Sequence, residues 1–241
     1  MAYVRRAAAA ALGALLLGGC FSLGAAQRRA QLEALLAEPG VPVVFDEHVG
    51  LAFVRVEDAL TFSSGFEAGE RLRAQFALPP PAPGFAEAFV AALCEDPRFA
   101  SSLLAPVELD AARDGLVARG AAPVFFASTG SWRLYYDLSL RRYRMSAWLN
   151  VQLTPAAAVA AGRGAMALPD RLWSGACTFR GPEQALPLER WLAGDGALLH
   201  EMLAEAQRRC GRRAAELLVA FLERGEEQRA FDVGDLPPAE R

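Results

Sequence analysis

Residues 132–153 read WRLYYDLSLRRYRMSAWLNVQL, and this stretch decides the fold. Apolar and polar side chains alternate along both halves of it. The positions predicted to face the core are Leu134, Tyr136, Leu138, Leu140, Tyr143, Met145, Ala147, Leu149, Val151 and Leu153. Alternation with a period of two predicts an antiparallel hairpin with one solvent-facing side. The turn is expected at Arg141-Arg142, which lacks the Gly or Asn that a tight primed turn prefers.

A third strand and a long helix follow the hairpin. Residues 171–179 place Trp173, Gly175, Cys177 and Phe179 on one strand face. A helix from about Asp195, a predicted N-cap, to Leu222 carries a continuous apolar stripe. The stripe residues are Leu199, Leu203, Ala206, Cys210, Ala214, Leu217 and Phe221. These patterns predict an α+β fold, with a small antiparallel or mixed sheet and a long C-terminal helix packed on one face.

The remaining segments are predicted from local signals. Helices are expected at 27–37, around Phe85, Phe89 and Leu93, at 110–119 and at 186–192. Strands are expected at 41–45, 51–56 and 123–127. The proline-rich residues 79–84 predict a stiff, polyproline-like surface connector, and residues 154–170 predict an exposed loop.

The N-terminus resembles the signal of bacterial lipoproteins. Arg5 and Arg6 precede an apolar run, and Leu17-Gly18-Gly19-Cys20 has the order of a lipobox. Residues 7–19 are only thirteen in number, too few to span a bilayer. The resemblance implies a signal peptide at 1–19, lipidation of Cys20 and a lipid-anchored tether at 20–26. A single α+β domain at 27–222 and a flexible, charged tail at 223–241 complete the expected organisation.

Three cysteines remain once Cys20 is assigned to lipid. In an oxidising compartment an odd number indicates one bridge and one free thiol, or no bridge at all. Cys177 lies on the predicted apolar strand face and Cys210 on the helix stripe. A helix covering that face brings both sulfurs into one interface, so we predict a Cys177–Cys210 disulfide with Cys94 free. The alternative is two reduced, buried cysteines.

Composition excludes some functions and favours none. Removing Arg5 and Arg6 with the signal lowers the net charge from −3 to −5, which argues against a nucleic-acid partner. Every basic residue is Arg, so lysine-dependent covalent catalysis is excluded. The sequence Asp46-Glu47-His48 reads as a solvated turn, and His200 as a surface capping residue. We therefore expect no metal, no cofactor and no enzymatic activity, with an envelope hydrolase as the weakest alternative.

The polar side of the hairpin carries the candidate binding residues. Tyr135 and Trp148 fall on it, and an exposed Trp suggests a contact surface, so we predict that they bind a partner protein. The cluster Arg141, Arg142 and Arg144 could bind phosphate or lipid headgroups, but a solvated hairpin tip is the favoured interpretation.

The body of the chain resembles a group of small α+β envelope lipoproteins. Two alternating strands, a loop, a strand beginning Leu172-Trp173-Ser174-Gly175 and a long Ala/Leu helix are similar to proteins related to the TolB amino-terminal domain and to auxiliary lipoproteins of envelope transporters. The resemblance, over roughly 100–222, implies a non-catalytic accessory or structural subunit of an envelope assembly or transport complex. A periplasmic carrier of lipid or small hydrophobes is the alternative. Phe21, in place of the Asp that favours inner-membrane retention in enteric bacteria, indicates the periplasmic face of the outer membrane.

Overall fold

The computed structural model describes residues 24, 26–37, 39–55, 65–138, 140–162, 171–225 and 231–232. Seven strands form one mixed sheet in the order β3-β1-β4-β5-β6-β7, and β2 also pairs with β4. The strands are β1 (Val43–Asp46), β2 (Ala52–Val54), β3 (Val107–Glu108), β4 (Pro123–Asp137), β5 (Arg142–Pro155), β6 (Trp173–Leu186) and β7 (Phe231–Asp232). The α-helices are α3 (Phe66–Gln75), α4 (Pro81–Cys94), α5 (Leu109–Arg119), α6 (Ala156–Ala160), α7 (Leu188–Leu192) and α8 (Ala197–Arg224). Residues 26–37 are also helical, as the sequence predicts.

The predicted hairpin is the centre of the sheet. β4 and β5 pair antiparallel from Pro123↔Pro155 to Asp137↔Arg142, which leaves a turn at 138–141. All the inward positions predicted on β5 are buried. On β4 the prediction is wrong at the tip, because the strand ends at Asp137: Leu138 is 63% exposed and Leu140 46% exposed. The separate strand predicted at 123–127 is the first part of β4.

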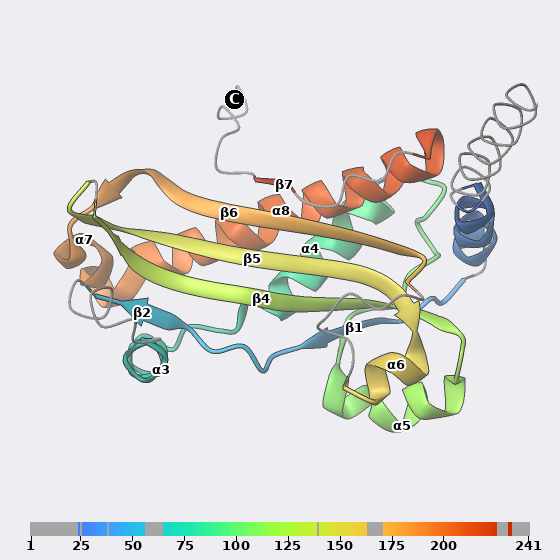
Figure 1. The fold of residues 1–241 in the computed structure, drawn as a ribbon, viewed down its shortest axis with the longest axis horizontal. Coiled ribbons are helices and arrows are strands. Elements are labelled where there is room, and N and C mark those ends of the chain that lie inside the picture. The colour runs from blue at the N-terminus through green and yellow to red at the C-terminus, as the bar shows by residue number, and fades with distance from the viewer. Residues whose placement is uncertain are drawn as a thin grey trace, which may run out of the picture.

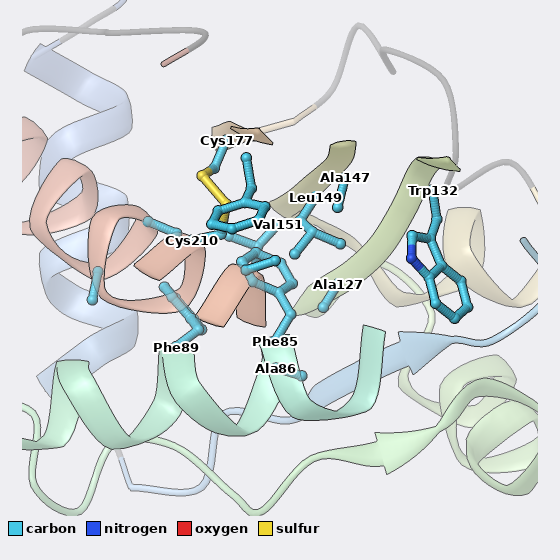
Figure 2. Close-up of a cluster of buried hydrophobic side chains, with 14 of the residues drawn as sticks. Phe85, Ala86, Phe89, Ala127, Trp132, Ala147, Leu149, Val151, Cys177 and Cys210 are labelled. Atoms are coloured by element: carbon cyan, nitrogen blue, oxygen red, sulfur yellow. A yellow bond between two sulfur atoms is a disulfide. The ribbon is translucent and has the colours of Figure 1, made fainter. Parts of the chain in front are cut away.

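One face of the sheet is covered by α4 and α8, as Figure 1 shows. Every residue of the predicted α8 stripe is buried, and Phe85 and Phe89 of α4 lie against the same face of the sheet (Figure 2). The Phe89 ring lies 5.4 Å from Phe125 and 6.4 Å from Trp173, measured between ring centroids. The fold is therefore α+β with the long C-terminal helix packed on one face, as predicted.

The predicted disulfide joins the sheet to α8. Cys177 of β6 and Cys210 of α8 are bonded, with their Cα atoms 5.4 Å apart (Figure 2). Cys94 is free, as expected, and its thiol points at the carbonyl oxygen of Phe99, 3.7 Å away. Burial raises the pKa of the Cys94 thiol.

Among the elements that the structure describes, α5 and α6 cover the opposite face of the sheet, and they cover it at one end only. There α5 and α6 enclose a second, smaller core (Figure 1). Its buried members are Val44, Leu109, Leu116, Val124, Phe126, Ala156, Val159 and Ala160. Gln152 is consequently only 2% exposed, so a solvent-facing side along the whole hairpin is wrong at this end. The loop predicted to start at residue 154 begins later, because β5 continues to Pro155 and α6 follows.

Two further expectations are corrected at helix N-termini. The proline-rich segment is no connector from residue 81 on, because Pro81 begins α4. Proline fits the first turn of a helix, where the missing N–H has no intrahelical partner. Asp195 does not cap α8: it lies in a short 3₁₀ turn with φ 54°, and Gly196 is the N-cap residue.

The structure also differs from the prediction in segments outside these elements. Helix α3 lies in a part of the sequence for which no helix or strand is predicted. In the predicted tail, α8 continues to Arg224, and residues 231–232 pair with β6 in a parallel arrangement. The rest of the tail, residues 226–230 and 233–241, lies outside the described residues, as do the predicted signal peptide and Cys20.

Candidate functional site

Between the α5/α6 end and the hairpin tip, no described helix covers the face of the sheet opposite α4 and α8 (Figure 1). Strand alternation directs one set of polar and aromatic side chains from three neighbouring strands to this face. We call this set the outer patch. Its members are Ser131, Arg133 and Tyr135 of β4, Arg144, Ser146 and Trp148 of β5, and Thr178 and Arg180 of β6.

Trp148 is the prominent apolar member of the outer patch. It is 47% exposed, whereas its β5 neighbours Ala147 and Leu149 are completely buried on the other face. Its indole lies on the backbone of Gly130, where a Cβ atom would be 2.4 Å from the ring. Gly130 sits at an irregularity of register between Thr129 and Ser131. The bulge and the missing side chain together provide the seat on which Trp148 lies across the sheet surface.

Tyr135 lines a shallow surface depression beside Trp148. The depression has a volume of about 370 Å³, and its lining residues are Val54, Arg133, Tyr135, Tyr136, Ser146, Thr178 and Arg180. Across the strands, Arg133 pairs with Ser146 and Ser146 with Arg180, while Trp148 pairs with Thr178. Tyr135 and Trp148 thus share one face, as the sequence predicts. Since Tyr135 pairs with Arg144, it is two rows of side chains, or about 14 Å, from Trp148.

The outer patch carries three arginines, and the carboxylate of Asp137 lies at its edge. Arg144 donates a hydrogen bond to the carbonyl oxygen of Glu183 at 2.8 Å, and its Nε lies 3.9 Å from a carboxylate oxygen of Asp137. Arg133 and Arg180 flank Ser146 across the sheet. Guanidinium groups bind carboxylates and stack on aromatic rings, and Trp and Arg are enriched at the centres of protein interfaces. The arrangement suits the binding of an acidic or mixed polar and aromatic surface.

The other candidates from the sequence lie elsewhere. His48 is exposed and hydrogen-bonded to Asp46, and its Nε2 lies 3.9 Å from Asp110. The hydrogen bond and charge of Asp46 raise the pKa of His48. His200 does not cap its own helix: its Nε2 donates to the carbonyl oxygen of Phe76, 2.9 Å away, linking α8 to the end of α3. Within the described ranges, no group of three or more His, Cys, Asp or Glu side chains is arranged to hold a metal ion.

The predicted lipid site, Cys20, lies outside the described residues. Among the helices that the structure describes, none is both long and apolar enough to span a bilayer.

Sequence reasoning missed most of the depression. The outward positions Arg133 and Ser146 follow from the hairpin alternation, which is the signal that could have found them. Thr178 and Arg180 become neighbours of Ser146 and Trp148 only through the pairing of β5 with β6, which no local pattern specifies.

No protein-family model, curated protein sequence or solved structure matches this chain. The likeness to envelope lipoproteins therefore remains a prediction from the sequence.

Proposed function

We propose that this chain is a non-catalytic, lipid-anchored accessory subunit of a cell-envelope assembly or transport complex, attached to the periplasmic face of the outer membrane through Cys20. Its partner is an envelope protein that binds the outer patch. The single observation that carries the proposal is the half-exposed Trp148, which lies one row of side chains from Arg133 and Arg180 on the part of the sheet that no described helix covers.

Exposure of Trp148 is unfavourable unless a partner covers it. Burying a fully exposed large apolar side chain contributes about 2–3 kcal/mol, so covering the exposed half of Trp148 contributes about 1–1.5 kcal/mol. Truncation of a central interface Trp typically weakens binding by more than 2 kcal/mol, or about 30-fold in Kd. The surrounding arginines would direct an acidic partner to this face and fix its register.

The disulfide and the anchor support the location. The Cys177–Cys210 bond is characteristic of proteins that fold in an oxidising compartment such as the periplasm. Because residues 26–37 pack onto the domain through Leu32 and Leu36, a lipid on Cys20 would hold the folded body close to the bilayer. Three residues, 21–23, separate Cys20 from the first described helical residue, Gly24, and three residues reach about 10 Å at most.

The carrier alternative receives no comparable support. A carrier of lipid or small hydrophobes needs an enclosed apolar cavity. The depression beside Trp148 and a second one on α8, of about 310 Å³, are both open to solvent and are both lined in part by arginine.

The proposal is tested by crosslinking in cells of the native organism, followed by affinity purification of the wild-type chain and of Trp148→Ala. Val117→Ala is the matched control, because Val117 is an exposed apolar residue on α5, far from the outer patch. We expect a stoichiometric envelope protein to co-purify with the wild type and the control and to be lost with Trp148→Ala. Equal recovery of the same proteins by all three chains would overturn the proposal.

A further inference from the structure

The tip of the β4–β5 hairpin combines exposed leucines with arginines. Leu138 and Leu140 are among the most exposed large apolar residues of the described chain, and Arg141 and Arg142 follow directly. Isolated exposed leucines are ordinary, but two at the end of one protruding turn form a compact apolar point. We infer that this tip is a membrane-contact site, which inserts Leu138 and Leu140 into the interface of an anionic bilayer while Arg141 and Arg142 bind lipid phosphates.

Charge asymmetry favours an anionic lipid surface as the occupant. Residues 131–148 contain four arginines and one acid, Asp137, in a chain whose net charge is −3. Asp137 is engaged within the hairpin, since it accepts a hydrogen bond from the Leu140 N–H at 3.3 Å and lies 3.9 Å from Arg144. In the described part of the chain Arg141 and Arg142 form no ion pair within 4.0 Å, although Asp137 lies opposite Arg142 in the β4–β5 register.

The backbone of the tip adds an independent observation. Arg141 has φ 51°, in the left-handed region that Gly or Asn adopts with least strain. A long cationic side chain is thus held at a position where glycine would serve the turn better. Strained residues of this kind occur preferentially at functional sites.

The position of the tip fits contact with a surface. In Figure 1 the β4–β5 turn and the helix at residues 26–37 lie at opposite ends of the ribbon, and β4, with fifteen residues, runs between them. A strand of this length extends about 50 Å. With the lipid of the proposed function at the opposite end, both ends contact one bilayer only when the strands run parallel to its surface, and the outer patch then lies between the two contacts. The inference does not depend on the proposed function.

Vesicle co-sedimentation tests the inference. The experiment uses a truncated protein that begins at residue 21. It carries no acyl group, because Cys20 is removed, and it retains all the described residues. It is mixed with vesicles of phosphatidylcholine alone or with roughly 30% phosphatidylglycerol, at low and at high salt. We expect binding to the anionic vesicles only, weakened by salt because exposed charges are screened.

Two variants and two controls locate the contact. Arg141→Gln/Arg142→Gln is expected to reduce binding about 10- to 30-fold, and Leu138→Ser/Leu140→Ser about 10-fold. Val117→Ser and Arg119→Gln, exposed substitutions on α5, are expected to leave binding within about twofold of the wild type. Because all the substituted side chains are exposed, unchanged thermal unfolding verifies the fold of each variant.

Absence of wild-type binding to anionic vesicles at low salt would overturn the inference, as would tip variants that bind as well as the controls. If the protein does not bind vesicles but the tip variants lose a co-purifying protein, the tip is a protein contact and the membrane inference is wrong. Loss of partner capture by Trp148→Ala alone concerns the proposed function and leaves this test unaffected.

Discussion

Gly211 of α8 and Gly115 of α5 are both helical glycines that can be replaced by alanine. Gly211 is packed against another helix, whereas Gly115 faces open space. A Cβ atom on Gly211 would lie 2.5 Å from the Cβ of Ala88 and 2.7 Å from the backbone of Ala88 and Phe89 in α4. A Cβ atom on Gly115 meets no heavy atom within 4 Å. Gly211 therefore sets the distance between the two covering helices, whereas Gly115 has no packing role.

The two effects on stability can be estimated from these distances. Alanine is favoured over glycine in a helix interior by about 1 kcal/mol, so Gly115→Ala is expected to stabilise the protein by about that amount. Gly211→Ala has the same gain, but it forces α4 and α8 apart by about 1 Å, because backbone atoms cannot rotate away. Overpacking of a core typically costs about 1–3 kcal/mol, and this contact is at the upper end. We expect a net loss of about 1–2 kcal/mol.

Urea unfolding followed by far-UV circular dichroism measures both variants against the wild type, with the disulfide oxidised throughout. Equal m-values would establish that the compared transitions expose similar surface. The predicted separation between the two variants is about 2–3 kcal/mol, with opposite signs. If Gly211→Ala is as stable as Gly115→Ala, then α4 and α8 are not in backbone contact at this position and the packing of the covering layer is wrong.

Three further predictions concern the disulfide, His48 and the hairpin turn. Reduction of the Cys177–Cys210 disulfide, which spans 33 residues, should lower the free energy of unfolding by about 3.7 kcal/mol through loop entropy. Urea unfolding with and without reductant measures this loss. An unchanged midpoint would contradict a native bridge. The pKa of His48 is raised by Asp46, so Asp46→Asn should lower it in an NMR titration. The charged His48–Asp46 pair favours the fold fully below pH ~6.5, and this contribution is lost as the pH rises through the raised pKa; identical titrations would exclude the pair. Arg141→Gly should raise stability by up to about 1 kcal/mol by relieving the positive φ, and a lower melting temperature would argue against the strained turn.

Local periodicity was sufficient for the centre of the fold. The alternation on β5 and the spacing of the α8 stripe each specify a buried face without knowledge of the partner element. Combining the two patterns also located the disulfide, because Cys177 and Cys210 lie on faces that have to meet.

The rest of the fold depends on packing between segments that are far apart in the sequence, which local patterns do not predict. The cover that α5 and α6 provide over one end of the sheet buries Gln152, although its polarity indicates exposure. The parallel pairing of β1 and β2 with β4 joins segments about 80 residues apart, and a local pattern contains no information about it. The same limit applies to the candidate site. Exposure of Trp148 could be read from the hairpin, but its seat on Gly130 and its neighbours on β6 depend on a bulge and on strand pairing.

Photo-crosslinking in living cells tests the central claim most directly. A photoreactive residue at Ser146, in the middle of the outer patch, is compared with one at Val117 on α5. We predict a single envelope protein crosslinked from position 146, absent from position 117 and abolished when Trp148→Ala is introduced. Crosslinks of equal yield from both positions, or a crosslink from 146 that survives Trp148→Ala undiminished, would contradict a partner-binding role for the outer patch.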